Sequence, residues 1–357
     1  IKEVRSMNYY ISILFRAIPL LMGIICLTYG SYIYTLGDKF GNEYIIASHV
    51  IIFFTTICIA LFTTAATIIR QLINKYNSFF KFILPTIGYL FAAISMVGGL
   101  YFALNNGGNP AYFVSGNIGF GVGLIACCVS TVALSSTKFL LIPSNSKNLK
   151  EGEKPKGCFS KEMSYVLIAI PIICTLIGLI FSFNLLRDTD KVPSLVAGFV
   201  LFGISLVCGS LISLVASVCR QIQNTFTNKE RWKWSILVIV LGSINLILGI
   251  CVLLFSKNQT FIAPGYVLIG LGLVCYSISS KVLLLASVWR RKSKLSKRIP
   301  LIPVITALAC LFLSAYLSES ELVNMAYFVP AHVMVGLGAI CFTLFSIVSI
   351  LESGTSN

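Results

Sequence analysis

The chain has 357 residues, of which 57% are apolar and 11% are charged, and its mean hydropathy is +0.91. Soluble domains carry about 25% charged residues. Uncharged stretches such as residues 82–137 and 192–219 exceed the roughly 20 residues with which a helix crosses a bilayer. The composition therefore excludes a water-soluble domain, and the sequence predicts an all-α polytopic membrane protein.

The net charge of +15 does not indicate nucleic-acid binding, because the basic residues lie in short connections between the apolar stretches. Basic residues in such connections attract anionic lipid headgroups. We therefore expect membrane lipids as partners and no nucleic acid. The sequence assigns no oligomeric state.

The apolar stretches predict ten membrane-spanning helices in a single membrane domain, residues 1–357. In chain order they are expected at Ala17–Leu36, Tyr44–Ile69, Phe82–Leu104, Tyr112–Leu141, Tyr165–Leu186, Ser194–Val218, Ser235–Phe255, Phe261–Trp289, Leu301–Leu317 and Tyr327–Leu351.

The positions of lysine and arginine predict the orientation of these spans. Most of them lie at the N-terminus and in the connections after the second, fourth, sixth and eighth spans. The opposite connections contain only Lys39, Arg187, Lys191 and Lys257. Because cytoplasmic loops carry the excess of positive charge, we expect both termini and a linker at residues 143–163 in the cytoplasm. We expect no cleavable signal peptide, since the first span lacks a small-residue cleavage site.

Five gapless segments of similar sequence begin the even-numbered spans. They are YIIASHVIIFFTTIC (Tyr44–Cys58), YFVSGNIGFGVGLIA (Tyr112–Ala126), SLVAGFVLFGISLVC (Ser194–Cys208), FIAPGYVLIGLGLVC (Phe261–Cys275) and YFVPAHVMVGLGAIC (Tyr327–Cys341). With the span before it, each segment forms one two-helix repeat, and the predicted repeats are residues 7–70, 79–142, 161–220, 232–290 and 299–351. One register aligns a set of residues that we call the variable column: His49, Asn117, Phe199, Tyr266 and His332.

The hairpin form of the repeat restricts the symmetry. Each hairpin returns the chain to the same side, so all five repeats are parallel and any symmetry axis runs along the membrane normal. A closed pseudo-fivefold ring is the simplest arrangement, and it would bring His49 close to His332. A flat or irregular packing of the hairpins would produce the same sequence pattern.

Two further features recur in the repeats. Four residues after the variable column, four repeats carry a glycine: Gly121, Gly203, Gly270 and Gly336. Small residues let helix backbones approach closely in lipid, so we expect these glycines at helix contacts. Most odd-numbered spans carry a proline near their start, which we expect in the first helical turn, where no hydrogen bond is lost: Pro19, Pro85, Pro171 and Pro303.

The two histidines of the chain, His49 and His332, both belong to the variable column. Histidine titrates near pH 6.5 when its environment does not perturb it. One interpretation is a neutral imidazole that is hydrogen-bonded within the bundle. The other is a pH-responsive pair near the outer mouth of a path that is also lined by Asn117, Phe199 and Tyr266, in which repulsion between protonated histidines loosens the bundle.

Charges within the predicted spans are rare. The acidic residues on the non-cytoplasmic side all fall in predicted loops: Asp38, Glu43, Asp188, Asp190, Glu319 and Glu321. A buried carboxylate is usual in proton-coupled and sodium-coupled carriers, so its absence from the predicted spans argues against an ordinary pump or symporter. Lys281 is the exception. It either reaches the inner interface or is capped by Ser277, Ser279 and Ser280, or it has a function such as anion binding.

No sequence pattern indicates an enzyme. The glycine-rich GFGVG at residues 119–123 lies within a predicted span, without the strand and turn of a phosphate-binding loop. The 12 cysteines include no CxxC pair and no spacing with histidine that is typical of a metal site. We therefore expect no catalytic residues, no cofactor, no metal and no disulfide framework.

Long segments of the chain resemble the YhiM family of enterobacterial inner-membrane proteins. The similar segments are FRAIPLLMGIIC, TFTNKERWKW, SISSKVLLLASVWRR, KRIPLIPV and YFVPAHVMVGLGAICFTLFSIVSILE, and the resemblance covers residues 7–352. It implies a location in the bacterial inner (plasma) membrane and a role in survival at low pH, without an established substrate. The family tends to have a histidine in several repeats, whereas this chain has one only at His49 and His332.

Together, the residues and the resemblance favour a pH-responsive channel or passive carrier for a small solute or ion. The first alternative is a structural or scaffolding membrane protein without a conducting path. The second is a solute transporter of unknown substrate.

Overall fold

The computed structural model describes the whole chain except residues 1, 73–75, 139–157, 289–297 and 356–357. The described α-helices are α1 (Lys2–Phe40), α2 (Asn42–Leu72), α3 (Ser78–Leu104), α4 (Pro110–Ser135), α6 (Lys161–Arg187), α7 (Val192–Ile222), α8 (Asn228–Phe255), α9 (Ile262–Val288), α10 (Leu301–Glu321) and α11 (Phe328–Thr355). Three short 3₁₀-helices accompany them: η1 (Ser136–Lys138), η2 (Gln259–Phe261) and η4 (Met325–Tyr327). Ten of the described helical segments are long and apolar enough to cross a membrane, so the all-α, ten-span prediction is confirmed.

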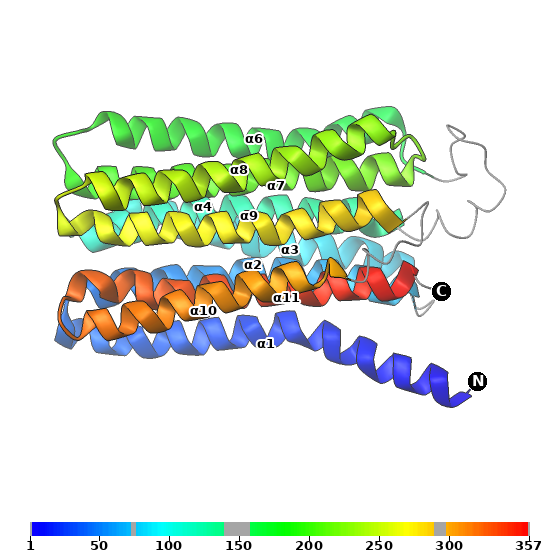
Figure 1. Cartoon of the computed structure of the whole chain (residues 1–357), viewed down its shortest axis with the longest axis horizontal. Helices are drawn as coiled ribbons and strands as arrows, with labels where there is room; N and C mark the ends of the chain where they lie inside the picture. The colour runs from blue at the N-terminus through cyan, green and yellow to red at the C-terminus, as the bar shows by residue number, and fades with distance from the viewer. Residues whose placement is uncertain (1, 73–75, 139–157, 289–297, 356–357) are drawn as a thin grey trace.

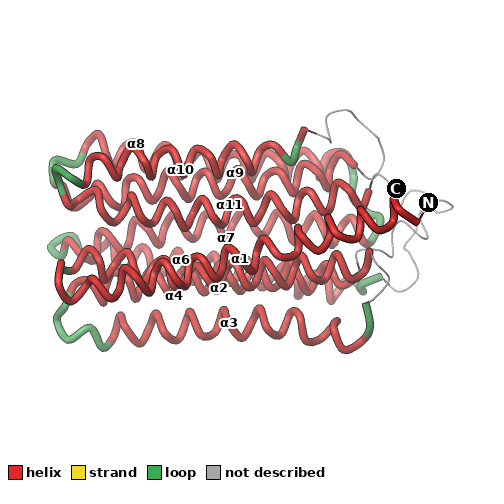
Figure 2. The backbone as a smooth tube through the Cα atoms, turned by 90° about the horizontal axis from the view of Figure 1, so that it is seen from below, coloured by secondary structure: helices red, strands yellow, loops and turns green. Residues whose placement is uncertain are grey.

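Consecutive helices pack as five hairpins: α1 with α2, α3 with α4, α6 with α7, α8 with α9, and α10 with α11. Figures 1 and 2 show that the connections within the hairpins lie at one end of the bundle and both chain termini at the other. We call the first the hairpin end, with its connections at residues 41, 105–109, 188–191, 256–258 and 322–324. We call the second the terminal end. All five hairpins therefore run in the same direction.

Local sequence signals account for the sharp turns at the hairpin end. Gly41 joins α1 to α2 with a φ of 118°, in the left-handed region that favours glycine. Asn109 caps α4 by accepting a hydrogen bond from the backbone N–H of Ala111, and Pro110 occupies the first turn of that helix. The same asparagine device begins η2 at Asn258 and η4 at Asn324. These caps fix where each returning helix starts.

The ten helices form two layers. The second helices of the hairpins contact one another in the cyclic order α2, α4, α7, α9, α11 and back to α2, and we call them the inner helices. Each remaining helix, here called an outer helix, packs against the inner helix of its own hairpin and that of the preceding hairpin. In this way α1 contacts both α2 and α11, so the first and fifth hairpins are neighbours.

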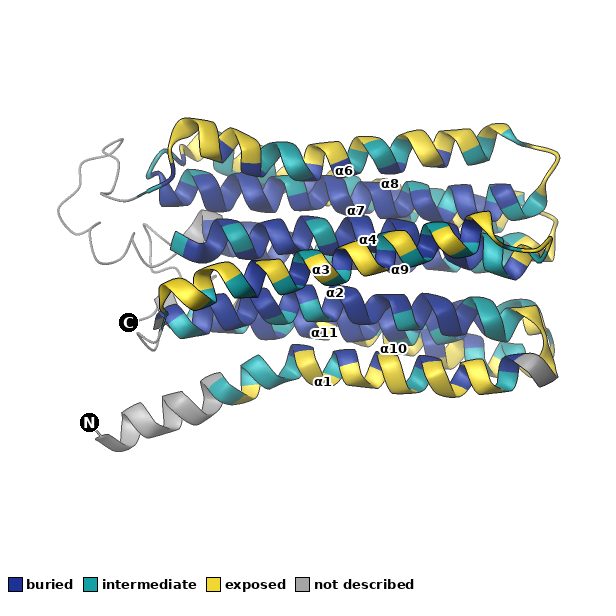
Figure 3. Cartoon of the chain, turned by 180° about the vertical axis from the view of Figure 1, so that it is seen from behind, coloured by how far each residue is buried: buried dark blue, intermediate teal, exposed yellow. Residues whose placement is uncertain are grey.

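Burial separates the two layers clearly. In the most apolar 18-residue stretch of each outer helix, 22% (α1) to 33% (α10) of the residues are buried. In the inner helices the corresponding fraction is 61% (α2) to 89% (α4). Figure 3 shows the exposed stripes on α1, α3 and α6 and the buried surfaces of α2, α4 and α7. Large apolar side chains such as Leu90, Ile247 and Phe312 are exposed on the outer helices. The outer helices thus present the lipid-facing surface.

The buried faces of the outer helices are stripes of small residues. On α3 the stripe includes Gly88, Ala92, Ser95 and Gly99, spaced three or four residues apart. Hydroxyl groups on these stripes hydrogen-bond to backbone carbonyls of the partner inner helix: Ser182 donates to Gly198 (2.8 Å) and Ser314 donates to Ala331 (2.7 Å). Gly198 and Ala331 each directly precede the variable column, so both hairpins use the same bond.

Several expectations about element boundaries were wrong. Pro19, Pro85 and Pro171 lie inside α1, α3 and α6, because these helices begin well before the apolar spans do. Four acidic residues that were expected in loops lie in helices: Asp38 in α1, Glu43 in α2, and Glu319 and Glu321 in the last turn of α10.

The predicted linker 143–163 falls outside the described residues up to residue 157. Its last residues, 161–163, already belong to α6, since the Ser160 hydroxyl caps this helix by accepting a hydrogen bond from the backbone N–H of Met163.

Candidate functional site

A cavity of about 530 Å³ lies between the inner helices at the hairpin end. All five inner helices or the 3₁₀-helices before them contribute to its wall, so it lies on the axis of the ring. Its lining is Asn42, Glu43, Ile46, Val50, Phe54, Pro110, Ala111, Val114, Ile118, Val192, Pro193, Val196, Val200, Ile204, Gln259, Thr260, Ala263, Pro264, Val267, Leu271, Asn324, Met325, Ala326, Val329 and Val333.

The lining follows the predicted register of the repeats. The residue directly after the variable column lines the cavity in every repeat and is always β-branched: Val50, Ile118, Val200, Val267 and Val333. The residue four positions earlier also lines it in every repeat: Ile46, Val114, Val196, Ala263 and Val329. Positions four apart lie on one face of a helix. Each inner helix therefore presents one continuous apolar stripe to the axis.

The rim of the cavity is polar and its walls are apolar. Asn42 begins α2, Gln259 and Thr260 lie in η2 before α9, and Asn324 precedes η4 before α11. Glu43 is the one charged residue in the lining. Small-molecule sites typically combine apolar walls with a few polar groups. The arrangement suits a small solute with an apolar part.

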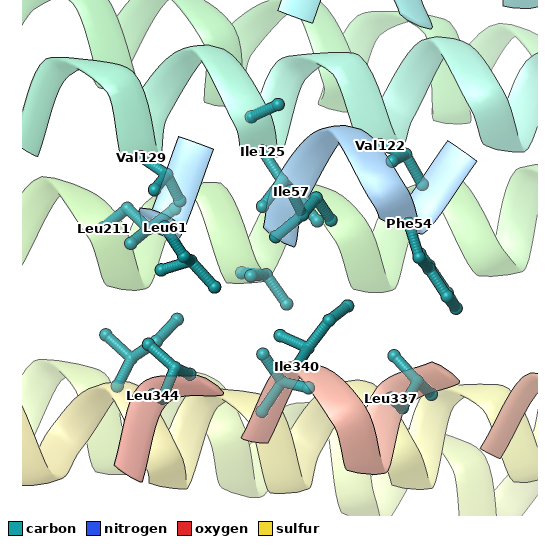
Figure 4. Close-up of a cluster of buried hydrophobic side chains, with 14 of the residues drawn as sticks. Phe54, Ile57, Leu61, Val122, Ile125, Val129, Leu211, Leu337, Ile340 and Leu344 are labelled. Carbon is teal, nitrogen blue, oxygen red and sulfur yellow. The ribbon is translucent and has the colours of Figure 1, made fainter. Parts of the chain in front are cut away.

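Three layers of apolar side chains close the inner end of the cavity, and we call them the plug; Phe54, Ile204 and Leu271 of its first layer form the floor of the cavity. Figure 4 shows labelled members of the plug from α2, α4, α7 and α11 pointing toward one another. In the repeat register the layers are Phe54, Val122, Ile204, Leu271 and Leu337; Ile57, Ile125, Val207, Val274 and Ile340; and Leu61, Val129, Leu211, Ile278 and Leu344. All belong to the buried core. A hydrophobic constriction of this kind blocks the passage of water and ions.

Lys281 lies past the plug on the same face of α9. It follows Ile278 by three residues, and it is 2% exposed. The serines predicted to cap it bond elsewhere: the Ser277 hydroxyl pairs with Thr306, while Ser279 and Ser280 donate to carbonyls of their own helix. Among the residues that the structure describes, none forms an ion pair or hydrogen bond with Lys281. The burial of Lys281 does not fit an ammonium that reaches the inner interface, and the predicted serine cap is wrong.

The variable column faces the seams between hairpins and not the axis. None of its five members is among the residues that line the cavity. Phe199 packs edge-on against Phe261 of the next hairpin, with ring centroids 6.1 Å apart, and Tyr266 contacts Tyr327 of the next hairpin at 6.4 Å. Asn117 is buried and donates to the carbonyl of Phe113 in its own helix. The residues that were predicted to line the path therefore lie one position before the residues that line the cavity.

His49 lies in the seam between the first and second hairpins. Its ring stacks on Phe102 with centroids 4.8 Å apart and an interplanar angle of 4°, and its Nδ1 is 2.9 Å from the Ser115 hydroxyl. Tyr34 and Tyr112 also contact the ring. These neighbours are aromatic or neutral polar side chains.

His332 lies in the seam between the fifth and first hairpins, at the equivalent position. The Tyr29 hydroxyl of α1 is hydrogen-bonded to its Nδ1, and Oε2 of Glu321 at the end of α10 lies 3.3 Å from its Nε2. Phe328 packs against the ring at 4.2 Å. The two histidines therefore have separate sets of contacts, and only His332 has a carboxylate partner among them.

The four predicted packing glycines occupy contacts between inner helices. A Cβ on Gly121, Gly203 or Gly270 would lie 2.5–2.6 Å from a leucine side chain of the next inner helix, and one on Gly336 would lie 2.5 Å from the Phe54 ring of α2. The first repeat has Phe53 in place of the glycine, and its ring packs on Gly119 of α4, where a Cβ would overlap it. At this seam the large and small residues have exchanged sides.

Sequence reasoning missed Tyr29, Glu43 and Glu321, and it missed the axial stripes. The five β-branched residues that follow the variable column were a visible signal for the stripes. The described residues include no group of three or more His, Cys, Asp or Glu side chains that could hold a metal ion.

The comparison with protein families matches residues 7–356 to the family described as "Protein of unknown function (DUF2776)". The chain belongs to this family. It is also 49% identical over 350 residues to the inner membrane protein YhiM of Escherichia coli (strain K12), covering 98% of this chain and 99% of that protein. No solved structure matches the chain. Ten candidate spans and this relative make the chain a multi-pass inner-membrane protein.

Proposed function

We propose that the chain is a passive conduit, either a channel or a carrier, for a small solute or ion, with the axial cavity as its entrance and the plug as its closed gate. The observation that supports this most strongly is that all five inner helices contribute equivalent residues to one cavity that ends at the plug. Empty apolar volume weakens a packed core, so a protein with only a scaffolding role has no use for it.

The distribution of charge indicates which end of the bundle faces the periplasm. Basic residues at the terminal end include Arg70, Lys138, Lys161, Arg220 and Lys229. Because positive loops stay in the cytoplasm, the hairpin end faces the periplasm in this proposal. Solute would then enter the cavity from the periplasm, and Glu43 would lie at the entrance.

Solute flux tests the proposal against its alternatives. Proteoliposomes containing the purified chain should release a small neutral solute such as glycerol, or an anion such as acetate, faster than empty liposomes, and acid on the hairpin side should change the rate. Equal release from both kinds of liposome at pH 7 and pH 5 would favour the scaffold. Release that saturates with solute concentration would favour a carrier.

The pH response is assigned to His332 in this proposal. In a neutral imidazole Nδ1 can accept the Tyr29 hydroxyl, but in an imidazolium both nitrogens are donors, so protonation forces this contact to rearrange. The new charge also faces Glu321 at 3.3 Å. Both partners lie where the first and fifth hairpins meet, so rearrangement there can loosen the ring.

We expect His332→Gln to abolish the acid dependence of solute flux and His49→Gln, the matched change in the same column, to preserve it. The ratio of flux at pH 5 to flux at pH 7 should fall to about one in the first variant, since the seam then has no imidazole that can gain a proton and rearrange the contacts with Tyr29 and Glu321. Loss of the response only in His49→Gln would assign the sensor to the other seam. The family resemblance suggests a role in survival at low pH. If that role depends on the conduit, His332→Gln should lower the survival of acid-challenged cells more than His49→Gln does.

A further inference from the structure

Lys281 lies on the axial face of α9, beyond the plug when viewed from the cavity. It continues the face of α9 on which Leu271 lines the cavity and Ile278 fills the plug. At a rise of 1.5 Å per residue, it lies about 15 Å further along α9 than Leu271. The equivalent positions on the other inner helices hold uncharged, buried residues: Thr64, Val132, Leu214 and Ile347.

No side chain within the described ranges balances this charge. The ion pairs found there are Lys191 with Asp188, Arg220 with Glu230, and His332 with Glu321. The Thr64 hydroxyl is used within its own helix, where it donates to the carbonyl of Ala60. An ammonium that leaves water without a counter-charge carries a large desolvation cost. Intramembrane charges that persist despite this cost typically mark ion or substrate pathways.

We propose that Lys281 is the binding site of a small monovalent anion, and that such an anion is the solute of the conduit. The second statement rests on the proposed function, whereas the first requires only that an anion can reach the buried ammonium. The anion supplies the counter-charge that the protein lacks, so binding removes most of the electrostatic cost of the site. One ammonium balances one negative charge, which selects against multivalent anions.

The cavity indicates the chemical class of the anion. Its walls are valine, isoleucine, alanine and proline, which can hold a short hydrocarbon chain. Glu43 at the rim repels anions, but it does not repel a weak acid that enters the cavity in its neutral, protonated form. A short-chain monocarboxylate fits both features, and chloride shares only its charge.

Anion-dependent stability of the full-length chain in detergent tests the site without requiring transport. Sodium acetate or sodium chloride replaces sodium gluconate at constant ionic strength, and Tm is measured. A ligand that binds only the folded state raises Tm with concentration. We expect acetate to raise the Tm of the native chain and of Lys281→Arg, but not that of Lys281→Met or Lys281→Gln.

The matched control is Leu214→Met at the equivalent position of α7, which should respond to acetate as the native chain does. Lys281→Met should fold, because it removes an uncompensated buried charge and fills the same space. An acetate response that survives in both Lys281→Met and Lys281→Gln, or that is missing from the native chain, overturns the proposal. If chloride raises Tm more than acetate does, the anion site at Lys281 stands, but a monocarboxylate is not its preferred ligand.

Flux separates this inference from the proposed function. In Leu344→Ser, which places a hydroxyl in the plug to open it, acetate should permeate faster than the neutral solute glycerol, and adding Lys281→Met should reduce that preference by about tenfold. An unchanged preference overturns the assignment of the solute. Opened-plug liposomes without any flux contradict the conduit alone, and the Tm measurement then decides on the anion site.

Discussion

Leu344→Ser should open the axial path permanently and raise solute flux through the chain by at least about tenfold at pH 7, since a hydrophobic constriction loses its barrier when a polar group wets it. Leu344 is 3% exposed and lies in the deepest layer of the plug (Figure 4). The substitution should also lower stability by about 2–5 kcal/mol, because it removes buried apolar volume. Efflux from proteoliposomes and the Tm in detergent measure the two effects.

The matched control for this variant is Ile247→Ser on α8. Its side chain is 62% exposed on the lipid-facing surface, so it makes an outer helix more polar without reaching the axis. We expect no rise in flux. If Ile247→Ser leaks as fast as Leu344→Ser, the leak comes from a loosened bundle, and the plug is not the gate.

Gly119→Leu should destabilise the bundle, and the double variant with Phe53→Gly should lose less stability than the sum of the two single changes. A leucine at residue 119 cannot share the seam between α2 and α4 with the Phe53 ring. Overpacking of this kind costs about 1–3 kcal/mol, and Phe53→Gly alone leaves a cavity that costs about 3–5 kcal/mol. The double variant should recover about 2 kcal/mol relative to the sum of the two changes.

The reason for this recovery is that the double variant gives the first seam the arrangement of the second and third seams, where Gly121 faces Leu201 and Gly203 faces Leu268. Gly98→Ala is the control, since its added Cβ would lie 3.7 Å from the nearest atom, a Phe53 ring carbon. Unfolding in a graded denaturant series measures all four variants. Purely additive losses would show that the five seams are not equivalent.

The number of spans and the hairpin arrangement were predictable from the sequence, because both follow from the length of uncharged stretches. Each inner helix has apolar residues on every side, so hydrophobicity alone does not show which side faces the axis. The variable column attracted attention because it holds histidine and asparagine, but it faces the seams. The axis is lined instead by the less conspicuous valines and isoleucine beside it, such as Val50 and Val267.

Contacts between distant parts of the chain were the least predictable. Tyr29 and His332 are separated by 303 positions, and they meet only because α1 packs against α11. Glu321 became a partner of His332 because α10 continues past its apolar stretch to that residue. The sequence also did not show that Lys281 lacks a hydrogen-bond partner among the described residues. Three serines nearby in the sequence could have capped it, but their hydroxyls all bond elsewhere.

Accessibility of engineered cysteines tests the central claim, an axial cavity that is open at the hairpin end and closed by the plug. Ile46→Cys and Ala263→Cys place a thiol in the cavity wall on two different inner helices, and Ile278→Cys places one in the plug. A membrane-impermeant thiosulfonate should modify the first two from the periplasmic side only, above the background of the native thiols, and should leave the third unmodified from either side. Equal modification of all three, or protection of both wall positions, would contradict the account.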